Sequence, residues 1–115
     1  NMEALTNAVL SAENTEARTT AAAELAKAVE LNAFESSGVL KTIDELITGK
    51  PVAKEGGALV FKALSDKFKG SAVPFLYTRL LKVVELSGDK KSAEVRDAAE
   101  NASKAFVKTM GAFAV

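Results

Sequence analysis

Apolar residues recur along this chain at intervals of three and four positions, and they do not alternate with polar ones over any strand-like stretch. That spacing keeps them on one side of an α-helix, whereas a β-strand needs a period of two. Short breaks containing glycine, serine or proline divide the pattern into successive segments. The pattern therefore predicts an all-α protein, with helices over about residues 2–11, 15–31, 36–48, 51–68, 71–86 and 92–110.

The expected helix ends carry residues that favour them. Pro51 and Pro74 stand in predicted first turns, where proline is tolerated because the first-turn amide has no partner within the helix. Asn14 or Thr15 can cap the second segment and Ser92 the sixth, since their side-chain oxygens accept from a free amide of the first turn.

Helical phase predicts which side chains enter the core. The aromatic residues fall mostly on apolar stripes, although Phe34 and Phe75 stand near helix starts, where they can be exposed. The predicted stripes include Ala17, Ala21, Leu25, Ala28 and Val29 in the second segment, and Val73, Leu76, Tyr77, Leu80, Leu81 and Val84 in the fifth.

Three of the segments resemble one another. Lys27, Lys62 and Lys104 each precede an alanine and an apolar residue, at separations of 35 and 42 residues. Pairs of small residues, 21–22, 56–57 and 98–99, stand at the same distance before each lysine. The period is that of repeated helix pairs, and small side chains suit a close helix crossing. The alternative is that alanine-rich amphipathic helices align by chance.

These observations predict an all-α, short HEAT-repeat-like α-solenoid of about three antiparallel helix pairs, forming a single domain over residues 1–115. The expected repeats cover about residues 2–31, 36–69 and 72–110. Residues 110–115 are apolar and lack the polar outer face of a capping repeat, so we expect the chain to be a fragment of a longer array. An apolar tail folded onto the core is the competing explanation.

Composition narrows the functional classes. The chain has neither Cys nor His, which excludes disulfides, Cys/His nucleophile pairs and Ser-His-Asp triads, and leaves no usual zinc ligands. Gly56 and Gly57 lie inside a helical pattern and not in a phosphate-binding loop. We therefore expect no catalytic residue, no cofactor and no metal in this segment. No apolar run approaches the roughly 18 residues of a membrane span, so no membrane partner is expected.

Positive charge is concentrated in the second half of a chain whose net charge is zero. Residues 1–49 carry three basic and eight acidic side chains, whereas residues 50–115 carry twelve and seven. The zero balance argues against a dedicated nucleic-acid-binding domain, and no DNA partner is expected. The lysines of the second half nevertheless form a candidate contact for RNA phosphates or an acidic protein surface. A solvated helix face is the alternative. The candidates are Lys50, Lys54, Lys62, Lys69, Lys90 and Lys91, of which Lys54, Lys62 and Lys69 lie within about 80° around the fourth helix.

Three motifs in order resemble a known family. They are AKEGGALVFKAL at residues 53–64, AVPFL at residues 72–76 and AEVRDAA at residues 93–99. This order is similar to the amino-terminal HEAT repeats of translation elongation factor 3, a fungal-type ATP-binding-cassette ribosome factor. The resemblance covers about residues 15–110. The family tends to have Arg-Glu-Gly where this chain has Lys54-Glu55-Gly56.

The resemblance implies a cytoplasmic, non-catalytic module that contacts ribosomal RNA or ribosomal proteins during translation elongation. It implies that a parent protein would be an ATPase, with ATP bound only in other domains. The alternative function is a general HEAT scaffold for another protein, with no ribosome or RNA contact. Salt dependence separates the two, because phosphate contacts weaken steeply with salt and apolar contacts do not.

Overall fold

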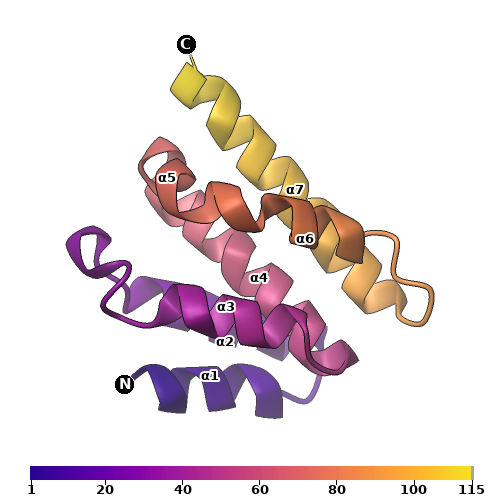
Figure 1. Ribbon diagram of the computed structural model, residues 1–115. Helices are drawn as coiled ribbons and strands as arrows, with labels where there is room; N and C mark the ends of the chain where they lie inside the picture. Colours follow the sequence, from indigo (N-terminus) through magenta and orange to yellow (C-terminus); the bar gives the residue numbers. More distant parts are fainter. Residues whose placement is uncertain (115) are drawn as a thin grey trace.

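The computed structural model describes the backbone of residues 1–114 and the side chains of residues 1–111. Within these limits the chain is helical and contains no strand, which confirms the predicted all-α class (Figure 1). The apolar terminal stretch that we expected to lack a capping face lies largely outside the described side chains. The α-helices are α1 Met2–Ser11, α2 Thr15–Lys27, α3 Val39–Ile47, α4 Pro51–Phe68, α5 Val73–Leu76, α6 Leu80–Leu86 and α7 Ala93–Ala114.

The helices form two layers (Figure 1). One layer holds α2, α4 and α7, and the other holds α1, α3, α5 and α6. Helix α4 is central, since it packs against α2 on one side, α7 on the other and α3 across the layers. Helix α1 packs on α2 and α6 on α7, so each helix of one layer pairs with one of the other. This is the HEAT-like arrangement of stacked helix pairs that the sequence predicts.

The helix starts are built as expected. The Asn14 side chain accepts a hydrogen bond from the Ala17 amide at 2.8 Å, and the Ser92 hydroxyl accepts one from the Val95 amide at 3.2 Å. Pro51 occupies the first turn of α4. Asn14, and not Thr15, is therefore the cap of α2.

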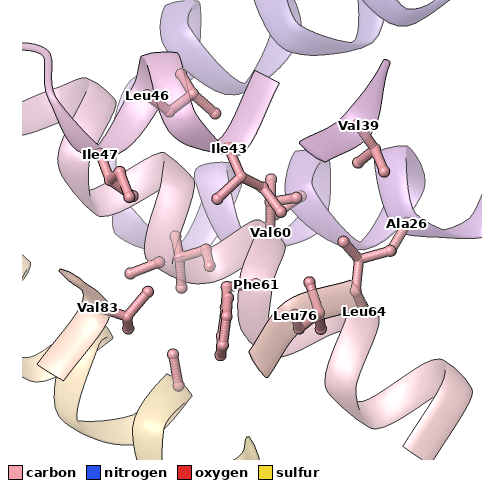
Figure 2. Packing of buried hydrophobic residues seen from close by; sticks show 14 of the residues in the cluster. Ala26, Val39, Ile43, Leu46, Ile47, Val60, Phe61, Leu64, Leu76 and Val83 are labelled. Carbon is pink, nitrogen blue, oxygen red and sulfur yellow. The ribbon is translucent and has the colours of Figure 1, made fainter. Parts of the chain in front are cut away.

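Equivalent positions of three segments are buried at the spacing of the internal repeat. The segments are α2 with the two residues that follow it, α4, and α7. The buried sets are Ala22, Gly57 and Ala99; Leu25, Val60 and Ala102; and Val29, Leu64 and Phe106. The apolar side chains at these positions belong to one continuous core with residues of α3, α5 and α6. Figure 2 shows Val60 and Leu64 of this core together with Ile43, Leu76 and Val83.

Two glycines allow α4 to approach its neighbours closely. A Cβ atom on Gly57 would lie 2.7 Å from Ile47 Cγ2 and 3.0 Å from Leu46 Cβ, both on α3. A Cβ atom on Gly56 would lie 2.6 Å from Val9 Cγ1 on α1. No side chain fits at either position without movement of a packed neighbour, which is the role predicted for small residues at a helix crossing.

The aromatic residues near helix starts pack inward. Phe34 is 1% exposed. Its ring stacks on that of Phe75 with centroids 4.6 Å apart and meets Phe68 edge-on at 5.5 Å. The expectation that Phe34 can be exposed is therefore wrong, because the turn after α2 folds this ring against the start of the third helix pair.

The inner face of α2 differs from the predicted one by one position. Ala17 and Ala28 are exposed, whereas Arg18 and Ala26 are buried. The helix also ends at Lys27, and a short 3₁₀ turn, Leu31–Ala33, follows it. A rotation of this kind follows from the burial of a charged residue, Arg18, which the apolar pattern assigns to the outside.

The fifth predicted segment is interrupted. One 3₁₀ turn, Lys69–Ala72, precedes α5, and a second, Tyr77–Arg79, separates α5 from α6. The interruption turns the apolar stripe, so Val83 and Leu86 are buried while Tyr77, Leu81 and Val84 are 58%, 70% and 42% exposed. Val52, an apolar residue in the first turn of α4, is 43% exposed.

A buried ion pair joins helices α1, α2 and α4. Arg18 Nη1 of α2 lies 2.6 Å from Glu55 Oε1 of α4, with both side chains almost fully buried. Arg18 also donates to the carbonyl oxygens of Val9 and Ala12 at the end of α1. The Thr15 hydroxyl donates to the second oxygen of Glu55. Every polar group of the pair therefore has a partner, which is the condition under which a buried ion pair is tolerated.

Alanine substitution at two glycines is expected to have opposite effects on stability. Gly57→Ala should lower the free energy of unfolding by about 1–3 kcal/mol, because the new methyl group overlaps Ile47. Gly111 lies exposed on α7, and a Cβ atom added there would meet nothing within 4 Å, so Gly111→Ala should raise stability by about 0.5 kcal/mol. Urea unfolding measures both, and a stabilising Gly57→Ala would contradict the packing described.

Removing one member of the buried pair is expected to be far more harmful than removing both. Arg18→Met or Glu55→Leu alone should cost about 3–5 kcal/mol, because an unpaired charge stays buried. The double variant Arg18→Met with Glu55→Leu should recover most of that loss. Urea unfolding of the three variants gives the coupling energy, and purely additive losses would show that the two residues act independently.

Candidate functional site: lysines on the layer of α2, α4 and α7

The predicted lysines separate into two groups along the layer of α2, α4 and α7. These helices run in the same general direction, so their starts lie toward one edge and their ends toward the other (Figure 1). The edge where α4 and α7 begin carries four of the candidates: Lys50, Lys54, Lys90 and Lys91. Lys62 lies in the second half of α4, and Lys69 follows its last residue. The structure therefore does not bring the six candidates into one cluster.

The first group is organised around an acidic residue. Asp89, in the loop between α6 and α7, accepts hydrogen bonds from the Lys91 and Ser92 amides at 3.1 and 2.9 Å. Lys54 Nζ lies 3.8 Å from the other oxygen of the same carboxylate. Desolvation raises the pKa of Asp89, but these two amides, with the charges of Lys54 and Arg96, bring that pKa below its ordinary value. Asp89 therefore offsets part of the positive charge at this edge.

The second group gains lysines from the neighbouring helices. Lys27 of α2 and Lys104 of α7 stand at the positions equivalent to Lys62 of α4, 35 and 42 residues away. Lys67 and Lys108 add to them on α4 and α7. We call this set the basic surface, and it consists of Lys27, Lys62, Lys67, Lys69, Lys104 and Lys108.

Two hollows cross the basic surface. The first, between α2 and α4, has a volume of about 510 Å³. The second, between α4 and α7, has a volume of about 420 Å³. Asp66 borders both hollows. The first hollow is lined by Thr19, Ala23, Ala26, Lys27, Leu59, Lys62, Ala63, Asp66 and Lys67; the second by Ser65, Asp66, Lys69, Lys104, Ala105, Lys108 and Thr109.

Acidic residues offset the basic surface only in part. Lys62 Nζ lies 2.9 Å from Asp66 Oδ2, and Lys104 Nζ lies 2.9 Å from Glu100 Oε1, both within one helical turn. These pairs are largely exposed, so their contribution to stability is small and their lysines stay accessible. The basic surface has six lysines, and these two carboxylates neutralise only part of their positive charge.

Lys67 has a structural role that the sequence did not indicate. Its ammonium group donates to three carbonyl oxygens at the end of α2: those of Ala26 at 3.0 Å, Lys27 at 3.0 Å and Val29 at 2.7 Å. It also lies 4.8 Å from the centre of the Phe68 ring. The last carbonyls of a helix have no partner within it and carry partial negative charge, so Lys67 of one helix pair caps a helix of the pair before.

The charge pattern of α4 alone does not point to Lys27, Lys104 or Lys108. The signal for the first two is present in the internal repeat, because Lys27, Lys62 and Lys104 hold equivalent positions and parallel helices of one layer bring such positions side by side. The acidic balance of the first half of the chain conceals the contribution of Lys27.

The described side chains include no candidate metal site. Among residues 1–111 no group of three or more acidic side chains is placed to hold a metal ion. None of the described helices is both long enough and apolar enough to cross a membrane.

Stacked helix pairs in two layers, with equivalent positions buried at the repeat spacing, define an α-solenoid of the HEAT class, a fold that generally serves for binding and not for catalysis. The model of the family described as "EF3 N-terminal HEAT repeat" matches residues 18–115. The chain belongs to this family, which confirms the resemblance found in its motifs. No curated protein and no solved structure matches it.

Replacing Lys67 is expected to loosen the end of α2. Lys67→Met keeps the apolar stem but removes the three hydrogen bonds, which should cost about 1 kcal/mol of stability. It should also speed amide hydrogen exchange in the last turn of α2. Lys108→Met removes a charge from an exposed position of α7 and serves as the control. Equal effects of the two variants would contradict a capping role for Lys67.

Proposed function

We propose that this chain is a non-catalytic binding module of an elongation-factor-3-like ATPase and that its basic surface contacts the ribosome during translation elongation. The observation that carries the proposal is the gathering of six lysines from three successive helix pairs on one side of the molecule. Membership of the elongation factor 3 family supports the ribosome as the partner. ATP would bind in other domains of such a protein, which would act in the cytoplasm.

The basic surface is a better candidate than the lysines around Asp89. At that edge, one carboxylate accepts from two loop amides and lies near Lys54. Lys50, Lys90 and Lys91 are exposed at that edge, as Lys69, Lys104 and Lys108 are on the basic surface. The basic surface differs because it extends over three successive helix pairs. Accessible lysines spaced across parallel helices can follow a row of RNA phosphates or the acidic face of a ribosomal protein.

The alternative function, a HEAT scaffold that binds only other proteins, has an observation of its own in its favour. The hollow between α2 and α4 contains apolar side chains, which phosphates do not need. The two functions would share Lys27, Lys62 and Lys67, which line this hollow, and the salt dependence of binding separates them.

Co-sedimentation with purified eukaryotic ribosomes over a salt series tests the proposal. We expect binding at low salt that weakens steeply as salt rises, because each lysine–phosphate contact releases counterions. Changing Lys69, Lys104 and Lys108 to Gln should weaken binding about tenfold or more. It should also lower the log–log salt slope by about one for each lysine that contacts a phosphate.

The matched control changes Lys50, Lys90 and Lys91 to Gln, which alters the net charge by the same amount at the opposite edge. This control should bind almost as the unaltered chain does. Absence of binding at low salt would overturn the ribosome contact. A larger effect of the control than of the first variant would move the contact to the edge around Asp89.

A further inference from the structure

The hollow between α2 and α4 has an apolar floor. Ala23 and Ala26 of α2 face Leu59 and Ala63 of α4 across it. Three of these four residues are alanines, and their short side chains leave the space of about 510 Å³ open. A floor of this kind attracts apolar side chains, because burying them there removes apolar area from water.

The rim of the same hollow is basic. Lys27 and Lys62 stand on opposite sides, on α2 and α4. Lys67 closes one end, and its hydrogen bonds to the end of α2 hold its charge in place. The single acid on the rim, Asp66, is paired with Lys62, so three lysines face one carboxylate. The rim therefore favours an occupant with acidic side chains beside its apolar ones.

The length of the hollow matches two turns of helix. Its lining on α2 runs from Thr19 to Lys27 and on α4 from Leu59 to Lys67, about 12 Å in each case at the rise of an α-helix. Apolar residues at positions i, i+3, i+4 and i+7 of a bound helix span about 10 Å, so one such stripe fits the floor. The parallel walls of α2 and α4 set its direction.

We propose that the hollow between α2 and α4 binds an acidic amphipathic helix of a partner protein. Apolar residues of that helix occupy the floor formed by Ala23, Ala26, Leu59 and Ala63, and its carboxylates meet Lys27 and Lys62. RNA is the weaker candidate for this hollow, because phosphates would leave the apolar floor uncovered and no aromatic side chain lines it for base stacking. The site shares Lys27, Lys62 and Lys67 with the basic surface, but it goes beyond the ribosome contact and does not depend on it.

Fluorescence anisotropy with a designed peptide tests the proposal on the full chain. The probe is a labelled helical peptide of about 16 residues, long enough to hold a helix, with leucines at i, i+3, i+4 and i+7 and glutamates on the other faces. A peptide of the same composition in scrambled order keeps the charge and loses the apolar stripe. We expect the ordered peptide to bind at least tenfold more tightly than the scrambled one.

Two variants separate shape from charge. Ala23→Arg places a long side chain in the hollow from an exposed position while keeping the rim basic, and we expect it to weaken peptide binding about tenfold. Lys27→Gln with Lys62→Gln should weaken binding about fivefold and flatten its salt dependence. Lys90→Gln with Lys91→Gln is the matched control and should bind as the unaltered chain does. Circular dichroism verifies that each variant is folded.

Three outcomes would overturn the proposal. One is equal binding of the ordered and scrambled peptides; another is unchanged or tighter binding by Ala23→Arg, which would show that charge alone attracts the peptide. The third is displacement of the peptide by a short RNA duplex with loss of RNA binding in Ala23→Arg, which would assign the hollow to RNA. Ribosome binding is read with Lys69, Lys104 and Lys108, outside this hollow, so failure here leaves that test unaffected.

Discussion

The buried pair between Arg18 and Glu55 is the constraint around which the first half of the molecule is organised. One guanidinium group binds the carboxylate of α4 and the last carbonyls of α1, so three helices meet at a single side chain. Burying two charges is costly unless every donor and acceptor is satisfied, and here Thr15 completes the set. The pair therefore fixes the relative positions of α1, α2 and α4. The glycines of α4 allow the close approach that this geometry needs.

Much of the fold could be predicted from the sequence, because helix formation is governed by local signals. The spacing of apolar residues, the capping side chain of Asn14 and the small residue at Gly57 each act within a few residues or at one crossing. Arg18 could not be placed in this way. Its partner, Glu55, is 37 residues away, and a hydropathy pattern assigns any arginine to the solvent side. Because Arg18 was assigned to the solvent side, the predicted inner face of α2 is displaced by one residue from the observed one.

The candidate site could be predicted in kind but not in extent. Helical phase along α4 grouped Lys62 with Lys69, and these lysines line two adjacent hollows, but it also included Lys54, which lies near Asp89 across a loop. A surface that crosses three helices depends on how those helices align, and only the internal repeat carries that information. Two equivalent lysines, Lys27 and Lys104, complete the row. Equivalent positions in successive repeats therefore indicate such a surface better than the charge pattern of one helix does.

The cap that Lys67 provides has a consequence for how the molecule unfolds. In a solenoid, stability is close to a sum of terms for each repeat and for each interface between neighbours. A polar cap donated across such an interface adds to the interface term, because α2 loses the partner of its last carbonyls whenever the end of α4 opens. The end of α2 therefore does not fray independently of α4. Local opening should therefore spread from the second helix pair into the first, so the two pairs unfold as one cooperative unit. The last carbonyls of α2 keep their hydrogen bonds only while the end of α4 is folded.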